Sequence, residues 1–379
     1  MNRLDEKYKD MIRHIMKNGV VKKDRTGTGT ISVFDYTIRH KMSEGFPLIT
    51  SKKMYWKGIV HELLWFLRGD TNIKCLVENG CHIWDGDAYK SYKTKIIKMV
   101  ESWDAKYHEV LKSEANSNRP FTQEEFIERI KTDDKFAAKW GDLGPIYGHQ
   151  WRKWGGHKVK HRLQHASGGS FGGPTSITYG DIVEYDVPGV DQIQNLIDDL
   201  KNNPDSRRLM VNAWNVGDID SMTLPPCHYG FQCYTYEMSL EERVSEWCRS
   251  LNKSIHYGDD MTSEKLDEIG FPVRKLSLKW TQRSTDSGLG LPFNFASYGL
   301  LLMMVANEVN MIPDELIFSG GDCHIYLNHF DGMNKQMRQE SYLLPKVVIT
   351  KKPIFDITIE DISLSNYQSS PKIEMPLSN

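Results

Sequence analysis

A long apolar segment, residues 296–309, constrains the fold of this chain more than any other feature. Its composition predicts a buried helix, because a helix without a broad polar face is stable only when other elements surround it. Strand-like segments precede it at residues 209–216, 229–236 and 276–282. Strands separated by single long helices favour an α+β or an α/β core.

Two further helices are predicted from apolar residues at helical spacing, over residues 4–16 and 56–67. The second contains Glu62 within an otherwise apolar stretch. The structural interpretation of a lone carboxylate in such a helix is that it is paired with another group or reaches the surface. The functional interpretation is that it lies in a site without water because the activity requires it there. The sequence leaves both interpretations of Glu62 open.

The charges of the chain are balanced, since 48 basic and 50 acidic residues give a formal net charge of -2. We therefore expect neither nucleic acid nor an anionic membrane as a partner, and any anion site must be local. No apolar run approaches the roughly 18 residues of a membrane-spanning helix, and the polar start is unlike a signal peptide. These features predict a cytoplasmic protein.

Cysteine usage points to one reactive thiol. The six cysteines form no CxxC pair, so we expect no metal site and no dense disulfide framework. Cys227 stands out because Pro225 and Pro226 fix the backbone ahead of it, although a small core residue is the alternative. A cysteine protease would need a separate histidine base, whereas the adjacent His228 would point to the opposite face of the strand.

Arginines recur at turns and strand ends, where a guanidinium can fork onto a phosphate. They are Arg25 on a glycine-flanked loop, the pair Arg207 and Arg208 after a turn, and Arg283 beside Ser284. Solvated surface arginines are the alternative. No GxxxxGKS/T pattern accompanies them, so a Walker-type site is not expected. If they converge on the cysteine, their charge would also favour its thiolate.

Two positions near the carboxyl end of the core have both a structural and a ligand-binding interpretation. Asn294 precedes the apolar helix, where it can cap the helix or read the edge of a heterocycle with its carboxamide. His324 and Tyr326 alternate on one face of a predicted short strand. That arrangement suits recognition of a hydroxyl group as well as it suits a structural network.

The order of these segments resembles the thymidylate synthase family. In the first half of the chain the matching motifs are Asp24-Arg25-Thr26-Gly27-Thr28-Gly29-Thr30, Phe46-Pro47-Leu48, His61-Glu62-Leu63-Leu64-Trp65-Phe66, Ile83-Trp84-Asp85 and Gly141-Asp142-Leu143-Gly144-Pro145-Ile146-Tyr147-Gly148. In the second half they are Pro204-Asp205-Ser206-Arg207-Arg208, Pro225-Pro226-Cys227-His228, Gln282-Arg283-Ser284, Pro292-Phe293-Asn294 and the segment from Gly321-Asp322 to His329. Left over are residues 88–139, 157–187 and 237–275, which we expect to be peripheral insertions in a single catalytic domain over residues 1–379.

The resemblance implies an α+β fold built on a large mixed sheet packed with helices, and a homodimer. It implies reductive methylation of dUMP to dTMP with 5,10-methylenetetrahydrofolate as the one-carbon donor, and Cys227 as the nucleophile that adds to C6 of the pyrimidine. The substrate phosphate would be held by a set of side chains of which the last two come from the partner subunit: Arg25, Arg283, Ser284, Arg207 and Arg208.

The resemblance also assigns the remaining contacts. Asn294 would read the uracil edge, and His324 and Tyr326 would bind the ribose hydroxyl. Glu62 would organise water and protons, and Tyr147 would assist removal of the C5 proton. Catalytic roles are thus implied for Cys227, Glu62, Tyr147, Arg283 and Asn294. The implied folate contacts are Lys52, Ile83, Trp84, Asp286 and the terminal Asn379.

Two positions depart from the family pattern. Gly86 and Asp87 stand where the family commonly has Glu-Trp, and the chain ends in polar residues where an aliphatic one is usual. Both changes lie where an exocyclic methylene intermediate must be kept from water.

These departures leave open whether hydride or water completes the reaction. If water replaced hydride, the product would be 5-hydroxymethyl-dUMP, as in the related hydroxymethylases. We expect dUMP rather than dCMP as the substrate, because the hydroxymethylases that act on dCMP typically carry an acidic residue at the position of Asn294. A non-catalytic nucleotide- or RNA-binding relative is a third interpretation, which the retained nucleophile and the balanced charge disfavour.

Overall fold

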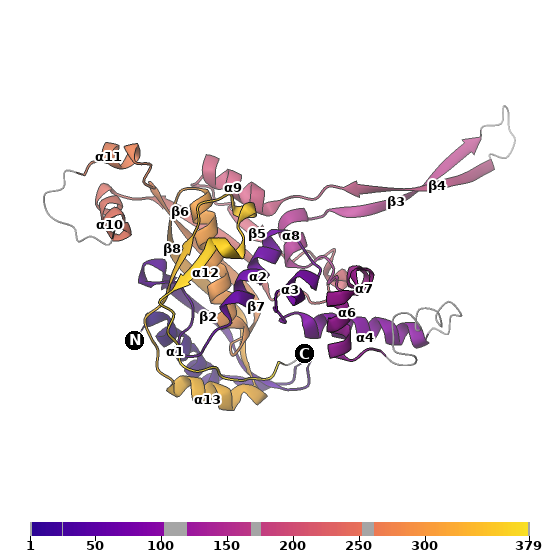
Figure 1. Ribbon diagram of the computed structural model, residues 1–379, viewed down its shortest axis with the longest axis horizontal. Helices are drawn as coiled ribbons and strands as arrows, with labels where there is room; N and C mark the ends of the chain where they lie inside the picture. Colours follow the sequence, from indigo (N-terminus) through magenta and orange to yellow (C-terminus); the bar gives the residue numbers. More distant parts are fainter. Residues whose placement is uncertain (1, 25, 102–119, 168–175, 252–260, 378–379) are drawn as a thin grey trace.

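A mixed β-sheet lies at the centre of the computed structural model, which describes residues 2–24, 26–101, 120–167, 176–251 and 261–377 (Figure 1). Its strands follow the order β1-β2-β8-β7-β6-β5. Their bounds are β1 Val20–Lys22, β2 Thr30–Lys41, β5 Met210–Asn212, β6 His228–Glu237, β7 Arg274–Asp286 and β8 Ile312–Tyr326. Strands β7 and β8 are parallel and the other neighbouring pairs are antiparallel, so the large mixed sheet of an α+β fold is confirmed.

The apolar helix predicted from the sequence is α12, Gly290–Glu308, which connects the parallel strands β7 and β8. It packs against both strands and against α2, Trp56–Leu67. Trp280 of β7 lies at the centre of this contact: its ring stacks on Tyr298 at 5.1 Å and meets Phe295 edge-on at 5.2 Å between centroids. Since buried aromatic side chains remove large apolar areas from water, this face of the sheet forms the main core.

The start of α12 excludes one of the two interpretations of Asn294, because its N-cap is Leu289 and not Asn294. The helix begins at Gly290, six residues before the predicted start at residue 296, so Asn294 lies inside it. Pro292 is tolerated there because the first N–H groups of a helix have no intrahelical acceptor. The Asp286 carboxylate instead accepts the N–H groups of Gly288 at 2.9 Å and Leu289 at 3.2 Å, just ahead of the helix.

The other helices and the short carboxyl-terminal strands surround this core (Figure 1). Helix α1 packs on β2, and α2 contacts α8. Both predicted amphipathic segments are therefore helices of the core. The remaining bounds are α1 Arg3–Asn18, α3 Lys74–Glu78, α8 Tyr147–Lys153, α9 Gln192–Asn202, α13 Phe330–Arg338, β9 Lys346–Ile349 and β10 Ile362–Ser365, with short 3-10 turns η1 Met42–Glu44, η2 Ile219–Ser221, η3 Leu327–His329, η4 Ile354–Asp356 and η5 Ile359–Asp361.

The face of the sheet opposite α12 carries large side chains that the described chain leaves uncovered. Along β6 burial alternates, with Phe231 and Cys233 toward the core and Gln232 and Tyr234 outward. On this outward face Tyr234 is 67% accessible, and Met210, which pairs with Gln232 and therefore points the same way, is 57% accessible. An apolar surface of this kind on a sheet is typical of a protein–protein contact.

The three segments predicted as insertions adopt regular structure. The first contains α4 Asp85–Glu101, α6 Gln123–Thr132 and α7 Asp134–Trp140. The second is a hairpin of β3 His157–Ser167 and β4 Ser176–Val187, which projects from the body of the molecule (Figure 1). The third contains α10 Leu240–Ser250 and α11 Ser263–Glu268. Their status as insertions in one catalytic domain stays a prediction.

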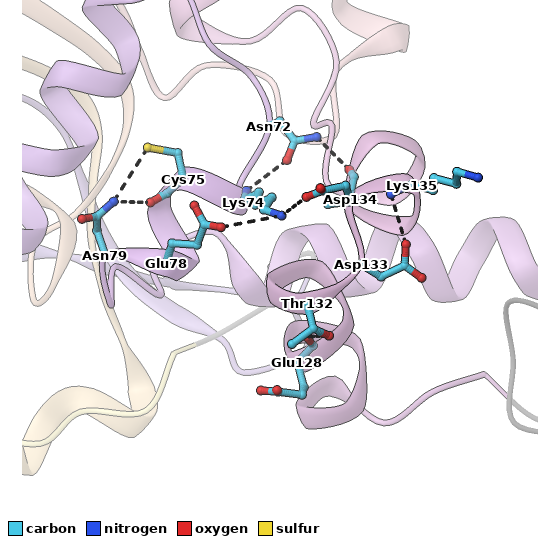
Figure 2. Close-up of polar contacts among 11 residues, drawn as sticks. Asn72, Lys74, Cys75, Glu78, Asn79, Glu128, Thr132, Asp133, Asp134 and Lys135 are labelled. Atoms are coloured by element: carbon cyan, nitrogen blue, oxygen red, sulfur yellow. Dashed lines mark hydrogen bonds and ion pairs between the residues drawn. The ribbon is translucent and has the colours of Figure 1, made fainter.

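A polar cluster joins α3 to the helices of the first segment (Figure 2). Lys74 forms an ion pair with Asp134 of α7 and lies 3.6 Å from Glu78 Oε1. The side chain of Asn72 donates to the carbonyl of Ala137 at 2.8 Å. Because surface ion pairs contribute little to stability, we interpret this cluster as fixing the position of α7 rather than holding it folded.

None of the helices in the described part of the chain combines the length and the apolar character that crossing a membrane requires.

Candidate active site

Cys227 lies immediately before β6, on a loop whose main chain is held from two sides. Its N–H donates to the hydroxyl of Tyr147 at 2.8 Å, and its carbonyl accepts the N–H of Arg283 at 2.9 Å. The preceding prolines restrict the backbone further, as the sequence indicated. The residue is half-buried, so the loop presents a thiol at a fixed place with access to solvent.

The Arg283 side chain lies along the loop of Cys227. Its Nε and one terminal nitrogen donate to the carbonyls of Pro226 and Pro225, each at 2.9 Å. The guanidinium also lies 5.2 Å from the centre of the Trp214 ring. A guanidinium beside a cysteine favours the thiolate form, so Arg283 is the arginine that the fold brings to this loop.

His228 is buried beneath the loop and does not serve Cys227 as a base. Its ring stacks on Tyr147 at 4.1 Å between centroids, and its Nδ1 lies 2.8 Å from the hydroxyl of Tyr298. Burial lowers the pKa of His228 to about 3, which keeps the imidazole neutral. This arrangement differs from the cysteine–histidine pair of a protease.

Glu62 is a carboxyl group in a dry site. It projects from α2, is 6% exposed, and its Oε1 accepts the indole N–H of Trp84 at 2.9 Å. Burial raises the pKa of Glu62 to about 7, and the hydrogen bond from Trp84 lowers it by less. Trp84 in turn lies 6.1 Å from the ring of Tyr147, so this carboxyl group belongs to the same cluster as the Cys227 loop.

The hydroxyl of Tyr147 is also in a dry environment. Burial raises the pKa of Tyr147 well above its ordinary value, and the neighbouring Cys227 adds to the effect. The tyrosine therefore stays protonated near neutral pH and can donate or accept a hydrogen bond at the thiol loop.

A second group of side chains surrounds the loop between β7 and α12. Lys52 is buried and donates to the carbonyl of Gly288, and burial lowers its pKa to about 8, while Asp286 partly offsets this. The hydrogen bonds from Gly288 and Leu289 end on Asp286 Oδ1, and the side chain of Asp286 is 24% exposed. Ser284 is half-buried two residues earlier on β7.

His324 and Tyr326 end β8, which is a long strand and not the short one predicted. Their rings meet at 5.1 Å and 83°, and His324 Nδ1 lies 3.4 Å from Asp322 Oδ1. The hydrogen bond from His324 lowers the pKa of Asp322 to about 2, and Lys22 adds to the effect. The ring of His324 thus takes part in a polar network. His324 also lies next to the Asp286 loop, because its carbonyl accepts the N–H of Ser287.

Arg207 and Arg208 are exposed and lie far from the thiol of their own chain. Residues 204–209 run beside the second half of β6, because Thr235 donates to the carbonyl of Pro204 and Cys233 donates its N–H to Leu209, each at 2.8 Å. At about 3.3 Å per residue, the six to eight residues back to the start of β6 span about 20–26 Å. That is longer than an arginine side chain can reach.

Of the remaining predicted site residues, two lie within the described part of the chain and two lie outside it. Asn294 is half-buried in the second turn of α12, one helical turn before Tyr298. Ile83 is half-buried next to Trp84. Arg25 and Asn379 lie outside the described residues. Among the described residues no group of acidic, histidine and cysteine side chains is arranged as a metal site.

A family model described as thymidylate synthase matches residues 6–379 of this chain. The chain belongs to the thymidylate synthase family. A thymidylate synthase of Mesoplasma florum is 37% identical over 369 residues, which cover 97% of this chain and 98% of the relative. One of Listeria monocytogenes serovar 1/2a is 36% identical over 384 residues, covering 98% and 99%. The resemblance inferred from the motifs is thus confirmed.

Three residues of this thymidylate synthase family member escaped the reasoning from sequence. Tyr298 could have been found, because it lies four residues after Asn294 on a helix and therefore on the same face. Trp214 had no such signal, and His329 ended a matching family motif without a role being predicted for it, since each meets its partner only through the tertiary fold.

Of the two departures from the family pattern, the structure describes the first and the residues that precede the second. Gly86 lies in the first turn of α4, directly after the motif that carries Trp84. Near the carboxyl end, Ile373 is buried, whereas Leu377 is 62% exposed.

Proposed function

We propose that this chain converts dUMP to dTMP by reductive methylation with 5,10-methylenetetrahydrofolate, using Cys227 as a covalent nucleophile. The observation that carries the proposal is the Cys227 loop, with its main chain fixed by Tyr147 and β7 and with the guanidinium of Arg283 along it. The names of the two relatives, each a thymidylate synthase matched over nearly its whole length, support the same reaction.

In this proposal the Cys227 thiolate adds to C6 of the pyrimidine, which makes C5 nucleophilic. Asn294 reads the uracil edge from α12, and His324 and Tyr326 bind the ribose hydroxyl from the end of β8. The phosphate lies among cationic and hydroxyl groups, so that the same field stabilises the thiolate. The proposed phosphate ligands are Arg283, Ser284, Arg25, and Arg207 and Arg208 of the partner subunit.

Glu62 and Tyr147 are proposed to handle protons. A carboxyl group with a pKa of about 7 can both accept and release a proton at neutral pH, which is the property that a general acid–base needs. Tyr147 lies between this carboxyl group and the thiol loop, where its hydroxyl can assist removal of the C5 proton.

The described residues fit a folate beside this cluster. When bound, the folate supplies the one-carbon unit and the hydride. Asp286 presents a carboxylate oxygen toward which a ring N–H of a pterin can donate, and Trp84 and Ile83 offer apolar surface near Glu62. Lys52 supports the Asp286 loop from beneath, and Asn379 is proposed at the end of the tail.

We propose that the active form is a homodimer that pairs the open sheet faces. Two observations support it: the uncovered apolar side chains on that face, and the distance that keeps Arg207 and Arg208 away from Cys227 of the same chain. In a two-fold dimer each subunit can supply these arginines to the site of its neighbour. Cytoplasmic location and the single-domain organisation stay predictions from the sequence.

Mixing two inactive variants should restore activity if the arginines cross the interface. In a mixed dimer of Cys227→Ala and the double variant Arg207→Ala/Arg208→Ala, one site has both the thiol and the arginines. Random exchange at equal concentrations should therefore restore about a quarter of wild-type dTMP formation.

The matched control mixes Cys227→Ala with Glu62→Gln. In the proposal each site takes both Cys227 and Glu62 from the same chain, so both sites of a mixed dimer are defective. This mixture should stay inactive. Absence of recovery in the first mixture, after native mass spectrometry has verified subunit exchange, would show that each chain uses its own arginines.

Hydroxymethylation is the second candidate, favoured by Gly86, by the polar residues that end the sequence and by the exposure of Leu377. Incubating the protein with dUMP and methylenetetrahydrofolate and identifying both products separates the two reactions. We expect dTMP with dihydrofolate, because the relatives are thymidylate synthases. Tetrahydrofolate with 5-hydroxymethyl-dUMP would overturn the methylation proposal in favour of water as the final reactant.

A further inference from the structure

His329 lies between the C-terminal tail, residues 371–377, and the loop that carries Asp286. It ends η3, and its side chain is completely buried. Its Nε2 lies 2.7 Å from the carbonyl oxygen of Pro376. Because a carbonyl oxygen only accepts hydrogen bonds, Nε2 carries the hydrogen and donates it to the tail.

The other ring nitrogen of His329 faces the Asp286 loop. Its Nδ1 lies 3.8 Å from Asp286 Oδ1, which is too far for a direct hydrogen bond, and it has no partner among the described residues. Gly288 makes this approach possible: a Cβ at that position would lie 2.9 Å from Nδ1 and 3.3 Å from the carboxylate oxygen. One imidazole therefore contacts the tail on one edge and Asp286 on the other.

The loop of Asp286 is held firmly on its remaining sides. The ammonium of Lys52 donates to the carbonyl of Gly288, and the hydroxyl of Tyr8 donates to the carbonyl of Ser287 at 2.7 Å. Both donors are buried. The loop thus provides a rigid support against which His329 can orient the tail.

The tail itself has few other attachments. Ile373 is buried, and the Met375 side chain lies over Gly332 of α13, where an added Cβ would be 2.8 Å from Met375 Cγ. Pro376 and Leu377 are exposed. Within the described residues, the bond from His329 is the last polar contact of the tail before the chain ends.

We propose that His329 is a positioning residue that locks the end of the tail beside Asp286, so that tail and carboxylate form one wall of the folate pocket. The assignment of folate to that pocket rests on the function proposed above. Loss of the lock would leave the nucleotide subsite intact and would weaken the productive binding of folate.

Two substitutions at His329 distinguish the effect of the hydrogen bond to Pro376 from the effect of having any polar side chain at this position. Glutamine places an amide nitrogen near the position of Nε2, whereas asparagine is too short to reach Pro376. We expect His329→Asn to raise the KM for methylenetetrahydrofolate about tenfold, with a smaller fall in kcat and unchanged dUMP affinity, and His329→Gln to stay within about threefold of the wild type.

A second measurement follows the tail directly. Amide hydrogen exchange at residues 373–377 should be faster in His329→Asn than in His329→Gln or the wild type. The matched control is His14→Asn, a surface histidine on α1, which should change neither the exchange nor the KM. Unchanged exchange in His329→Asn would overturn the proposal, whether or not the protein proves to make dTMP.

A truncated chain that ends at Met375 keeps His329 and removes its acceptor. It should show at least the same rise in the KM for folate, since it also removes the proposed folate contact Asn379, and adding His329→Asn to it should change nothing further, because both changes remove the bond between His329 and Pro376. Additive effects, or a truncated protein with wild-type KM, would contradict the proposal even if His329→Asn failed to fold. Absence of dTMP formation by the wild type would instead refute the proposed function and leave the exchange experiment as the test of the lock.

Discussion

Replacing Cys227 with alanine should lower dTMP formation by at least about four orders of magnitude while leaving the protein folded. The thiolate forms the covalent bond to C6 in the proposed reaction, and alanine has no group that can replace it. The contacts to Tyr147 and Arg283 that hold this loop are made by main-chain atoms of residue 227, so they survive the substitution. Initial rates and thermal unfolding of the two proteins test both expectations.

Cys75→Ser is the matched control for removal of a thiol. Cys75 is half-buried on α3, where its sulfur accepts a hydrogen bond from Arg68 at 3.3 Å, away from the Cys227 loop. We expect activity close to that of the wild type. With 5-fluoro-dUMP and the folate, the wild type and Cys75→Ser should form an adduct that survives denaturation, and Cys227→Ala should form none.

Two outcomes would contradict the assignment of Cys227. Turnover retained by Cys227→Ala would place the nucleophile elsewhere. A wild-type protein that binds dUMP but forms neither adduct nor product would be a nucleotide-binding relative and not an enzyme.

Replacing Glu62 with glutamine should stabilise the protein at high pH and lower kcat by about two to four orders of magnitude. Glutamine keeps an acceptor for the indole N–H of Trp84 but cannot exchange a proton. The stability effect follows from the pKa of Glu62, which burial raises from about 4.5 to about 7.

The sign of the pH dependence follows from proton uptake. Below pH 4.5 the carboxyl group is protonated in both the folded and the unfolded chain, so its ionisation costs nothing. Between pH 4.5 and 7 the unfolded chain has lost this proton while the folded one retains it, and stability falls as pH rises. Above pH 7 the loss levels off at about 3 kcal/mol, which the glutamine variant avoids.

Urea unfolding at pH 5 and at pH 8 measures this difference. The free energy of unfolding of Glu62→Gln relative to wild type should rise by about 2–3 kcal/mol between the two values, slightly less than the full loss because the unfolded chain is already largely ionised at pH 5. Glu128→Gln, an exposed position on α6, is the control and should show no such rise. A pH dependence shared by Glu62→Gln and wild type would mean that the carboxyl group ionises freely in the folded protein.

Much of the fold could be predicted because it depends on local properties of the chain. The all-apolar stretch of α12 has to be buried wherever the rest of the chain lies, and the amphipathic stripes of α1 and α2 require a core on one side. The predicted start of α12 lies six residues too late, since the sequence does not show that Asp286 accepts the N–H groups just ahead of the helix.

The sequence by itself determined the rigid setting of Cys227, because the restriction that two prolines impose on a backbone is covalent and independent of the fold. Only the tertiary structure decided which groups surround that thiol. Arg283 reaches the loop of Cys227 through the pairing of β6 with β7, whereas Arg207 and Arg208 lie beside the far end of β6. The raised pKa of Glu62 likewise depends on burial by segments distant in the chain, and burial is a property of packing that no local pattern contains.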